Sequence, residues 1–158
     1  MPPERFSIWK TWLARTSLSD LRSPGVYALS VSADDLSEAE FSWLPQIVYF
    51  GMTNSLAGLA GRLKQFDNTL NGKFGHGGAE RFRRDFPHAE ELYSRLYVAV
   101  MPFKCNVASN EPADLITMGS VAKAEYECLA HFAGLFGRLP KYNDKKNSPK
   151  LTKVPVAE

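Results

Sequence analysis

The chain has 158 residues, of which 44% are hydrophobic and 12% aromatic, and its formal net charge is +2. This length fits a single domain over 1–158 with one sizeable core. The sequence contains neither an apolar run of membrane-helix length nor a secretory leader, which favours a soluble, cytoplasmic protein without membrane association. Cys105 and Cys128 lie far apart outside any Cys-x-x-Cys motif, so neither a disulfide framework nor a structural zinc site is expected.

The first part of the chain predicts one helix and one strand. Residues 4–15 carry large apolar side chains at mixed three- and four-residue spacings, which is typical of a short amphipathic helix. Pro24-Gly25 interrupts this pattern, and the run Val26–Val31 predicts a strand. The acidic residues of 33–45 are expected to form a connector.

The middle of the chain predicts a second strand followed by two helical segments. Residues 47–50 are continuously apolar, and the cluster Thr53-Asn54-Ser55 offers an N-cap for a helix over 56–66. The composition of 67–78 favours a loop, and helical spacing resumes over 79–86 before a proline ends it.

The C-terminal half predicts a third strand and the longest helix. Residues 94–103 alternate, with Leu96, Val98 and Val100 on one face, and 104–116 should connect this strand to a helix over 118–136. On that helix Glu125 shares a face with several apolar residues, and a buried carboxylate requires a partner or a metal ion.

Several of these residues suit the hydrolysis of a phosphodiester. That reaction needs an activated water, positive charge near the phosphate oxygens and neutralisation of the leaving oxygen. Tyr27 and Tyr49 could orient or deprotonate a water if a cation or metal perturbs their usual pKa of about 10. Arg62 offers a forked donor to phosphate, and Glu125 offers a hard oxygen ligand for Mg²⁺.

These residues occur in an order that matches a known signature. Gly25-Val26-Tyr27 and Tyr49-Phe50-Gly51 lie in the first two expected strands, and Arg62, Glu125 and Asn143 follow, the last within Leu139-Pro140-Lys141-Tyr142-Asn143. Over about 25–143 the sequence therefore resembles the GIY-YIG nuclease superfamily.

The resemblance implies a fold and an activity. The fold is α+β, with a small three-stranded antiparallel sheet flanked by helices in a core of about 22–144. The helix over 4–15 and a polar, basic tail over 144–158 would be additions to this core. The activity would be that of a DNA endonuclease with one divalent metal, Mg²⁺ or Mn²⁺, acting in restriction, repair or mobile-element biology. A homodimer would suit double-strand cleavage.

The resemblance also implies a role for each site residue. Tyr49 would be the general base or orient the water, and Tyr27 would hydrogen-bond the water or the scissile phosphate. Arg62 would stabilise the developing charge, and Glu125 would hold the metal on the leaving-group side. Asn143 would brace the site through hydrogen bonds.

Two departures from the family pattern leave alternatives open. The gap from Gly51 to Arg62 is longer than in compact members, and Phe66 stands at a position that is often histidine. Lys64 and His76 are the candidates to replace that proton-handling group. The alternatives are a catalytically weak or inactive nucleic-acid-binding module of the same fold, or an unrelated protein in which the tripeptides are accidental.

The distribution of basic residues suggests where a nucleic acid would bind. A net charge of +2 is too small to indicate such a partner by itself. A glycine-rich stretch over 72–78 precedes a basic helix, a combination that suits phosphate contacts. The expected DNA-contacting residues are Lys73, Arg81, Arg83 and Arg84.

Overall fold

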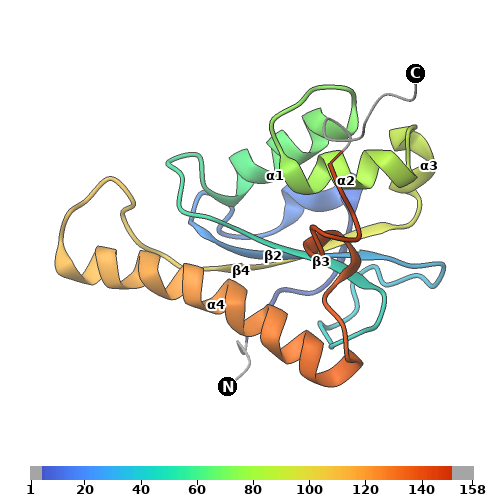
Figure 1. Ribbon diagram of the computed structural model, residues 1–158. Coiled ribbons are helices and arrows are strands. Elements are labelled where there is room, and N and C mark those ends of the chain that lie inside the picture. Colours follow the sequence, from blue (N-terminus) through green and yellow to red (C-terminus); the bar gives the residue numbers. More distant parts are fainter. Residues whose placement is uncertain (1–4, 151–158) are drawn as a thin grey trace.

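The computed structural model, which describes residues 5–150, is an α+β fold built on one antiparallel sheet (Figure 1). The strands lie in the order β1-β4-β2-β3, so that β3 is an edge strand. The two central strands, β2 and β4, pair over seven consecutive residue positions. The strands are β1 (Lys10–Thr11), β2 (Gly25–Val31), β3 (Ile47–Thr53) and β4 (Leu96–Pro102).

The expected N-terminal helix over 4–15 is wrong for the part that the structure describes. Residues 10 and 11 pair with β4 as a fourth strand, and a 3₁₀ helix, η1 (Trp12–Ser17), follows. The reason is that Trp9 and Trp12, both fully buried, pack into cores on opposite faces of the sheet. A chain that passes along the edge of the sheet can bury both rings, whereas a helix would direct its apolar stripe to one side.

Three helices cover one face of the sheet: α1 (Gly58–Leu70), α2 (Gly77–Asp85) and α3 (Ala89–Tyr93). The expected loop over 67–78 is shorter, because α1 continues to Leu70 and buries Thr69 and Leu70. The expected N-cap is also wrong: Ala57 occupies that position, and the Thr53 hydroxyl instead hydrogen-bonds that of Ser55 at 2.8 Å. The helix α3, which the sequence did not predict, buries Ala89 and Leu92.

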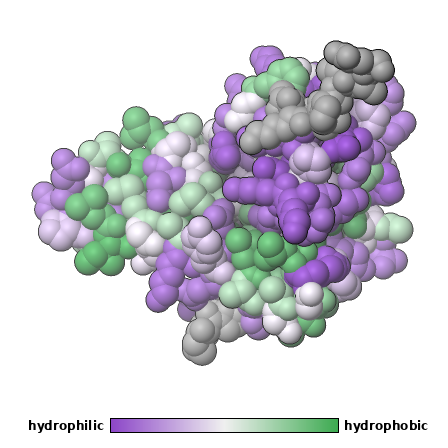
Figure 2. All heavy atoms as spheres, viewed as in Figure 1, coloured by the Kyte–Doolittle hydropathy of each residue, from purple (hydrophilic) through white to green (hydrophobic). Residues whose placement is uncertain are grey.

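The long helix α4 (Pro112–Phe136) covers the opposite face. It begins earlier than expected, with proline in its first turn, and ends at Gly137, whose φ of 69° only glycine adopts readily. Its first turns extend beyond the sheet and expose Leu115 and Ile116, so no buried stripe marked them in the sequence (Figures 1 and 2). Within the described residues, no helix is long and apolar enough to cross a membrane.

The alternation of the strands separates two cores. Leu96, Val98 and Val100 face α1 and α2, as expected from the sequence, while Tyr97 and Ala99 face α4. After α4 the chain returns along β3 through a short 3₁₀ helix, η2 (Lys141–Asn143). The expected basic tail over 144–158 is described as far as residue 150. The open edge at β3 is therefore the place where residues from both layers can meet.

Candidate active site

The two signature tyrosines lie side by side on the face that carries α1 and α2. In the β2–β3 register Tyr27 is opposite Gly51 and Leu29 is opposite Tyr49, so the tyrosines are diagonal neighbours. Their ring centroids are 6.0 Å apart. Tyr27 is fully buried and Tyr49 is half-buried toward the edge of the sheet.

Each tyrosine ring packs over a glycine. A Cβ atom on Gly51 would overlap the ring and hydroxyl of Tyr27. A Cβ atom on Gly78 would lie 2.6 Å from Cζ and 2.8 Å from the hydroxyl oxygen of Tyr49. The glycine that ends the second signature tripeptide is therefore required for space, because any side chain there would displace Tyr27.

Arg62, on α1, is near all the other expected reactive groups. Its Nη1 donates to Oε1 of Gln65 at 2.7 Å, and it lines a hollow of about 490 Å³ together with Asn54 and Gly61. Burial is the first cause of the pKa shifts of Tyr27, Tyr49, His76 and Glu125, and the charge of Arg62 lowers the pKa of each. One arginine thus lies within electrostatic reach of residues from β2, β3, α4 and the start of α2.

Both tyrosine hydroxyls are protonated at neutral pH. Burial raises the pKa of Tyr27 well above 10, and the neighbouring Tyr49 raises it further. Burial also raises the pKa of Tyr49, against the charge of Arg62, and the nearby Arg81 opposes the shift as well. Because two arginines act on Tyr49, it is the tyrosine whose anion the site stabilises better.

His76, at the N-cap of α2, is fully buried and hydrogen-bonds Tyr27, with Nε2 2.7 Å from the hydroxyl oxygen. Its Nδ1 accepts the backbone N–H of Ala79 at 3.3 Å. Burial and the charge of Arg62 lower the pKa of His76 to about 3, so the imidazole is neutral. With Nδ1 acting as acceptor, the proton is on Nε2 and points at Tyr27.

Phe66 occupies the position where the family often has histidine, and His76, rather than Lys64, places a titratable group next to it. Phe66 is fully buried, and its ring centroid is 4.9 Å from that of His76 in an edge-on contact. Lys64 is exposed on α1. The histidine preceding two glycines at a helix start is the sequence signal for this placement, since a histidine nitrogen can cap the helix.

Glu125 faces the site from α4. Burial raises the pKa of this carboxyl group, against the charges of Lys145 and Arg62. Glu127 instead forms an ion pair with Lys123 at 3.8 Å on the same helix. No group of three or more His, Cys, Asp and Glu side chains within 5–150 could hold a metal. The residues still fit Mg²⁺, which proteins often bind through one or two carboxylates together with substrate phosphate and water.

Asn143 joins η2 to the middle of the second signature tripeptide. Its Oδ1 accepts the N–H of Phe50 at 2.9 Å, and its Nδ2 donates to the carbonyl oxygen of Phe50 at 2.8 Å. This side chain therefore pairs with the edge strand as a neighbouring strand would. Asn143 thus contacts the backbone next to Tyr49, and its role in this arrangement is structural.

The four basic residues expected to contact DNA divide between two places. Arg81 is 8% exposed, and its charge acts on both Tyr49 and His76. Arg84 lies one turn further along α2 and is exposed. Arg83 instead donates to the Lys73 carbonyl oxygen at 3.4 Å and lies over the ring of Phe74. Of these four residues, Arg81 and Arg84 lie on the side of η2.

Comparison of the chain with family models, with curated proteins and with solved structures gave no match. The geometry of the site is therefore the basis for assigning a function.

Proposed function

We propose that this protein is a metal-dependent endonuclease of the GIY-YIG type that hydrolyses DNA phosphodiester bonds. The observation that supports this most strongly is the convergence of Tyr27, Tyr49 and Glu125 within electrostatic reach of Arg62. In this proposal the antiparallel strands β2, β3 and β4 would correspond to the three-stranded sheet that the resemblance implies, and β1 would be an addition.

The charges of the site suit a phosphodiester. Arg62 and Arg81 supply positive charge from one layer of the fold, and both lower the pKa of His76. Lys150 also lowers the pKa of His76, and its Nζ lies beside the start of α2, where a Cβ on Gly77 would be 3.1 Å away. Glu125 is the carboxylate whose charge raises the pKa of both tyrosines. A phosphate at this position would compensate the buried Arg81, which otherwise carries a desolvation cost.

The tyrosines would handle the proton of the attacking water. Tyr49 would orient or deprotonate that water, because Arg62 and Arg81 both stabilise its anion. Tyr27 receives the Nε2 proton of His76 and donates its own hydroxyl proton to Tyr49, so it would act on the water through Tyr49. Asn143 would keep Tyr49 in place through the backbone of Phe50.

Glu125 would hold Mg²⁺ or Mn²⁺ on the leaving-group side. A bound divalent ion supplies Lewis-acid stabilisation of the leaving oxygen. Burial raises the pKa of this carboxyl group, and the charges of Lys145 and Arg62 oppose that rise and favour its ionised form.

Nicking of supercoiled plasmid in the presence of Mg²⁺ or Mn²⁺ tests the proposal. Glu125→Gln and Arg62→Ala should each lower the nicking rate at least about 100-fold, as expected when one group that stabilises a transition state is removed. Glu127→Gln is the matched control, because it removes the same charge from a neighbouring position of α4 that faces Lys123. Equal nicking by the Glu125 and Glu127 variants, with folding confirmed by circular dichroism, would contradict the proposal.

The second candidate is a module that binds nucleic acid without cutting it. It is favoured by His76, which is neutral and already donates its proton, so that no imidazole nitrogen is ready to accept one. DNA binding without metal-dependent nicking over a panel of linear, branched and single-stranded substrates would select this candidate.

A further inference from the structure

A second, smaller hollow lies beside the candidate active site, between α2 and the segment that follows η2. Its volume is about 300 Å³. It is lined by three cationic side chains, one carboxylate and the end of the described chain: Arg81, Arg84, Lys141, Asp85, Asn147, Ser148 and Pro149. Positive charge therefore dominates it.

Arg81 is the residue that marks this hollow as a binding site. It is only 8% exposed, and within 5–150 its Nε has no hydrogen-bond partner. A buried guanidinium with an unsatisfied donor costs free energy, and such groups are kept where a ligand compensates them. The same side chain acts on the pKa of Tyr49, so the hollow and the reaction centre share this residue.

The single carboxylate does not cancel the charge of the hollow. Asp85 accepts hydrogen bonds from the Tyr142 hydroxyl at 2.6 Å and from Nζ of Lys141 at 2.8 Å. These bonds hold Lys141 at the rim. With Asp85 engaged by one lysine, Arg81 and Arg84 remain to attract an anion, and a forked guanidinium suits phosphate oxygens.

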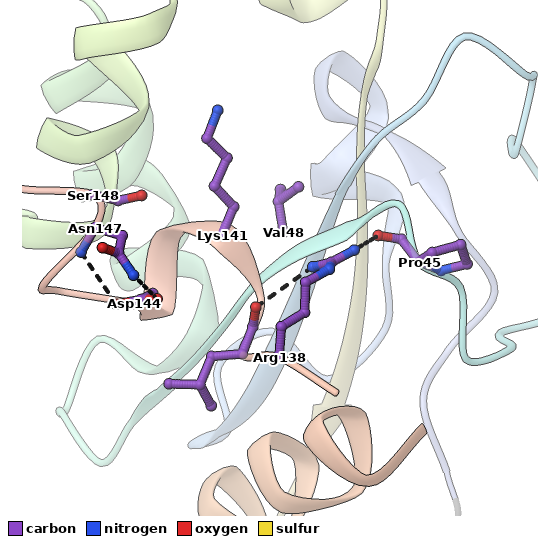
Figure 3. Close-up of a pocket in the computed structure, with 8 residues that line it drawn as sticks. Pro45, Val48, Arg138, Lys141, Asp144, Asn147 and Ser148 are labelled. Atoms are coloured by element: carbon purple, nitrogen blue, oxygen red, sulfur yellow. Dashed lines mark hydrogen bonds between the residues drawn. The ribbon is translucent and has the colours of Figure 1, made fainter. Parts of the chain in front are cut away.

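The hollow continues into a larger one, of about 540 Å³, along the edge strand (Figure 3). The two share Lys141, Asn147 and Ser148. In Figure 3 the Lys141 side chain extends away from Arg138, which is bound to the Pro45 carbonyl oxygen at 3.1 Å. An elongated ligand could thus follow the edge of the sheet past η2, whereas a single small anion would fill only the smaller part.

We propose that Arg81, Arg84 and Lys141 form a subsite for one phosphate of a nucleic-acid strand, separate from the phosphate that meets the tyrosines. The identity of the ligand as a DNA strand depends on the proposed nuclease function, while the anion site itself does not. The shared chemistry is a phosphate oxygen, which free phosphate could also supply, so the test must distinguish these two sources.

Salt-dependent binding of a duplex oligonucleotide tests the subsite apart from cleavage. The full chain carrying Glu125→Gln is used without divalent metal, with Arg84→Gln as the added change. Arg84→Gln should weaken binding about 3- to 10-fold and lower the slope of log K against log salt by about 1, as loss of one phosphate contact does. Arg95→Gln is the control, since Arg95 is an exposed arginine that lies over Phe86 and lines neither hollow. It should change neither quantity.

Neutral methylphosphonates placed singly along the oligonucleotide locate the contact. At one position the methylphosphonate should weaken binding to the parent protein and leave the Arg84→Gln protein unaffected. Inorganic phosphate is the second probe: it should compete with the oligonucleotide only at millimolar concentration if the site takes a strand. Competition by micromolar phosphate, together with no position at which methylphosphonate weakens binding, would contradict a nucleic-acid strand as the ligand. It would show that the subsite binds a free anion.

The outcomes separate this inference from the proposed function. Equal weakening by Arg84→Gln and Arg95→Gln would overturn the subsite even if the protein nicks plasmid. A selective effect of Arg84→Gln in a protein that never nicks plasmid would support the subsite and contradict the nuclease.

Discussion

The hydroxyl oxygen of Tyr27 and Nε2 of His76 lie 2.7 Å apart, and both side chains are fully buried. Because Nδ1 of His76 accepts the Ala79 N–H, the hydrogen bond runs from the imidazole to the tyrosine. The start of α2 therefore fixes the direction in which Tyr27 can donate its own proton. That proton is directed to the hydroxyl oxygen of Tyr49, the tyrosine that lies on the edge strand.

Tyr27→Phe should destabilise the protein, because it leaves the buried Nε2–H of His76 without an acceptor. An unsatisfied buried donor costs about 1–3 kcal/mol in the free energy of unfolding. Urea unfolding followed by circular dichroism measures this change. Tyr126→Phe, at a tyrosine that is 72% exposed, should stay within about 0.5 kcal/mol of the parent. Equal stabilities of the two variants would contradict the hydrogen bond.

His76 should make stability fall on acidification. The unfolded chain protonates this histidine below its ordinary pKa of about 6.5, whereas the folded protein protonates it only near pH 3. Between these values the unfolded state binds more protons, so the free energy of unfolding falls by up to about 1.4 kcal/mol per pH unit. Above pH 6.5 this contribution is fully present.

The measurement compares parent and His76→Gln by urea unfolding at several pH values between 7.5 and 4. The difference in stability between the two proteins should shrink as the pH falls. A constant difference across this range would show that the imidazole titrates normally in the folded protein.

Gly51→Ala should displace Tyr27, because the new Cβ overlaps its ring and hydroxyl. We expect a loss of about 1–3 kcal/mol, as in other overpacked cores, together with a large loss of nicking. Gly134→Ala is the matched control: a Cβ there meets nothing within 4 Å, and alanine favours helix α4 by up to about 1 kcal/mol. The melting temperature should therefore fall for Gly51→Ala and not for Gly134→Ala, and only Gly51→Ala should lower the rate of plasmid nicking.

Asn143→Ala should free the backbone of the edge strand at Phe50. The amide hydrogen of Phe50 should then exchange with solvent at least about 5-fold faster, which corresponds to the loss of a bond worth about 1 kcal/mol or more. Hydrogen exchange followed by NMR measures this rate directly. Unchanged protection of Phe50 alongside lost nicking would instead indicate that Asn143 acts on the substrate.

The strands could be predicted because they are short apolar runs bounded by glycine or proline, and β4 alternates between two faces. The N-terminal segment could not, since Trp9 and Trp12 have a spacing compatible with a helix and are buried on opposite faces only because the sheet lies between them. The first turns of α4 carry no buried stripe, so their periodicity gave no signal.

Within the site, the ordered motif led us to expect that Tyr27, Tyr49, Arg62 and Glu125 act together. Both tyrosines lie within electrostatic reach of Arg62 and Glu125, and the catalytic roles stay predictions. His76 was one of two candidates from the sequence, but its hydrogen bond to Tyr27 could not be predicted, because the two residues are 49 positions apart. The division of the basic residues likewise depends on the turn of α2, which directs Arg81 and Arg84 to one side and Arg83 to another.

The sheet separates two cores, and at its edge strand β3 the site takes residues from the layers on both faces. Tyr27 and Tyr49 belong to the core beneath α1 and α2, whereas Glu125 comes from the helix that closes the other core. Local opening of either layer would separate the carboxylate from the tyrosines while the other layer stays folded. On heating, the proposed activity should therefore be lost before the sheet itself unfolds, because it requires both layers to be packed on the sheet.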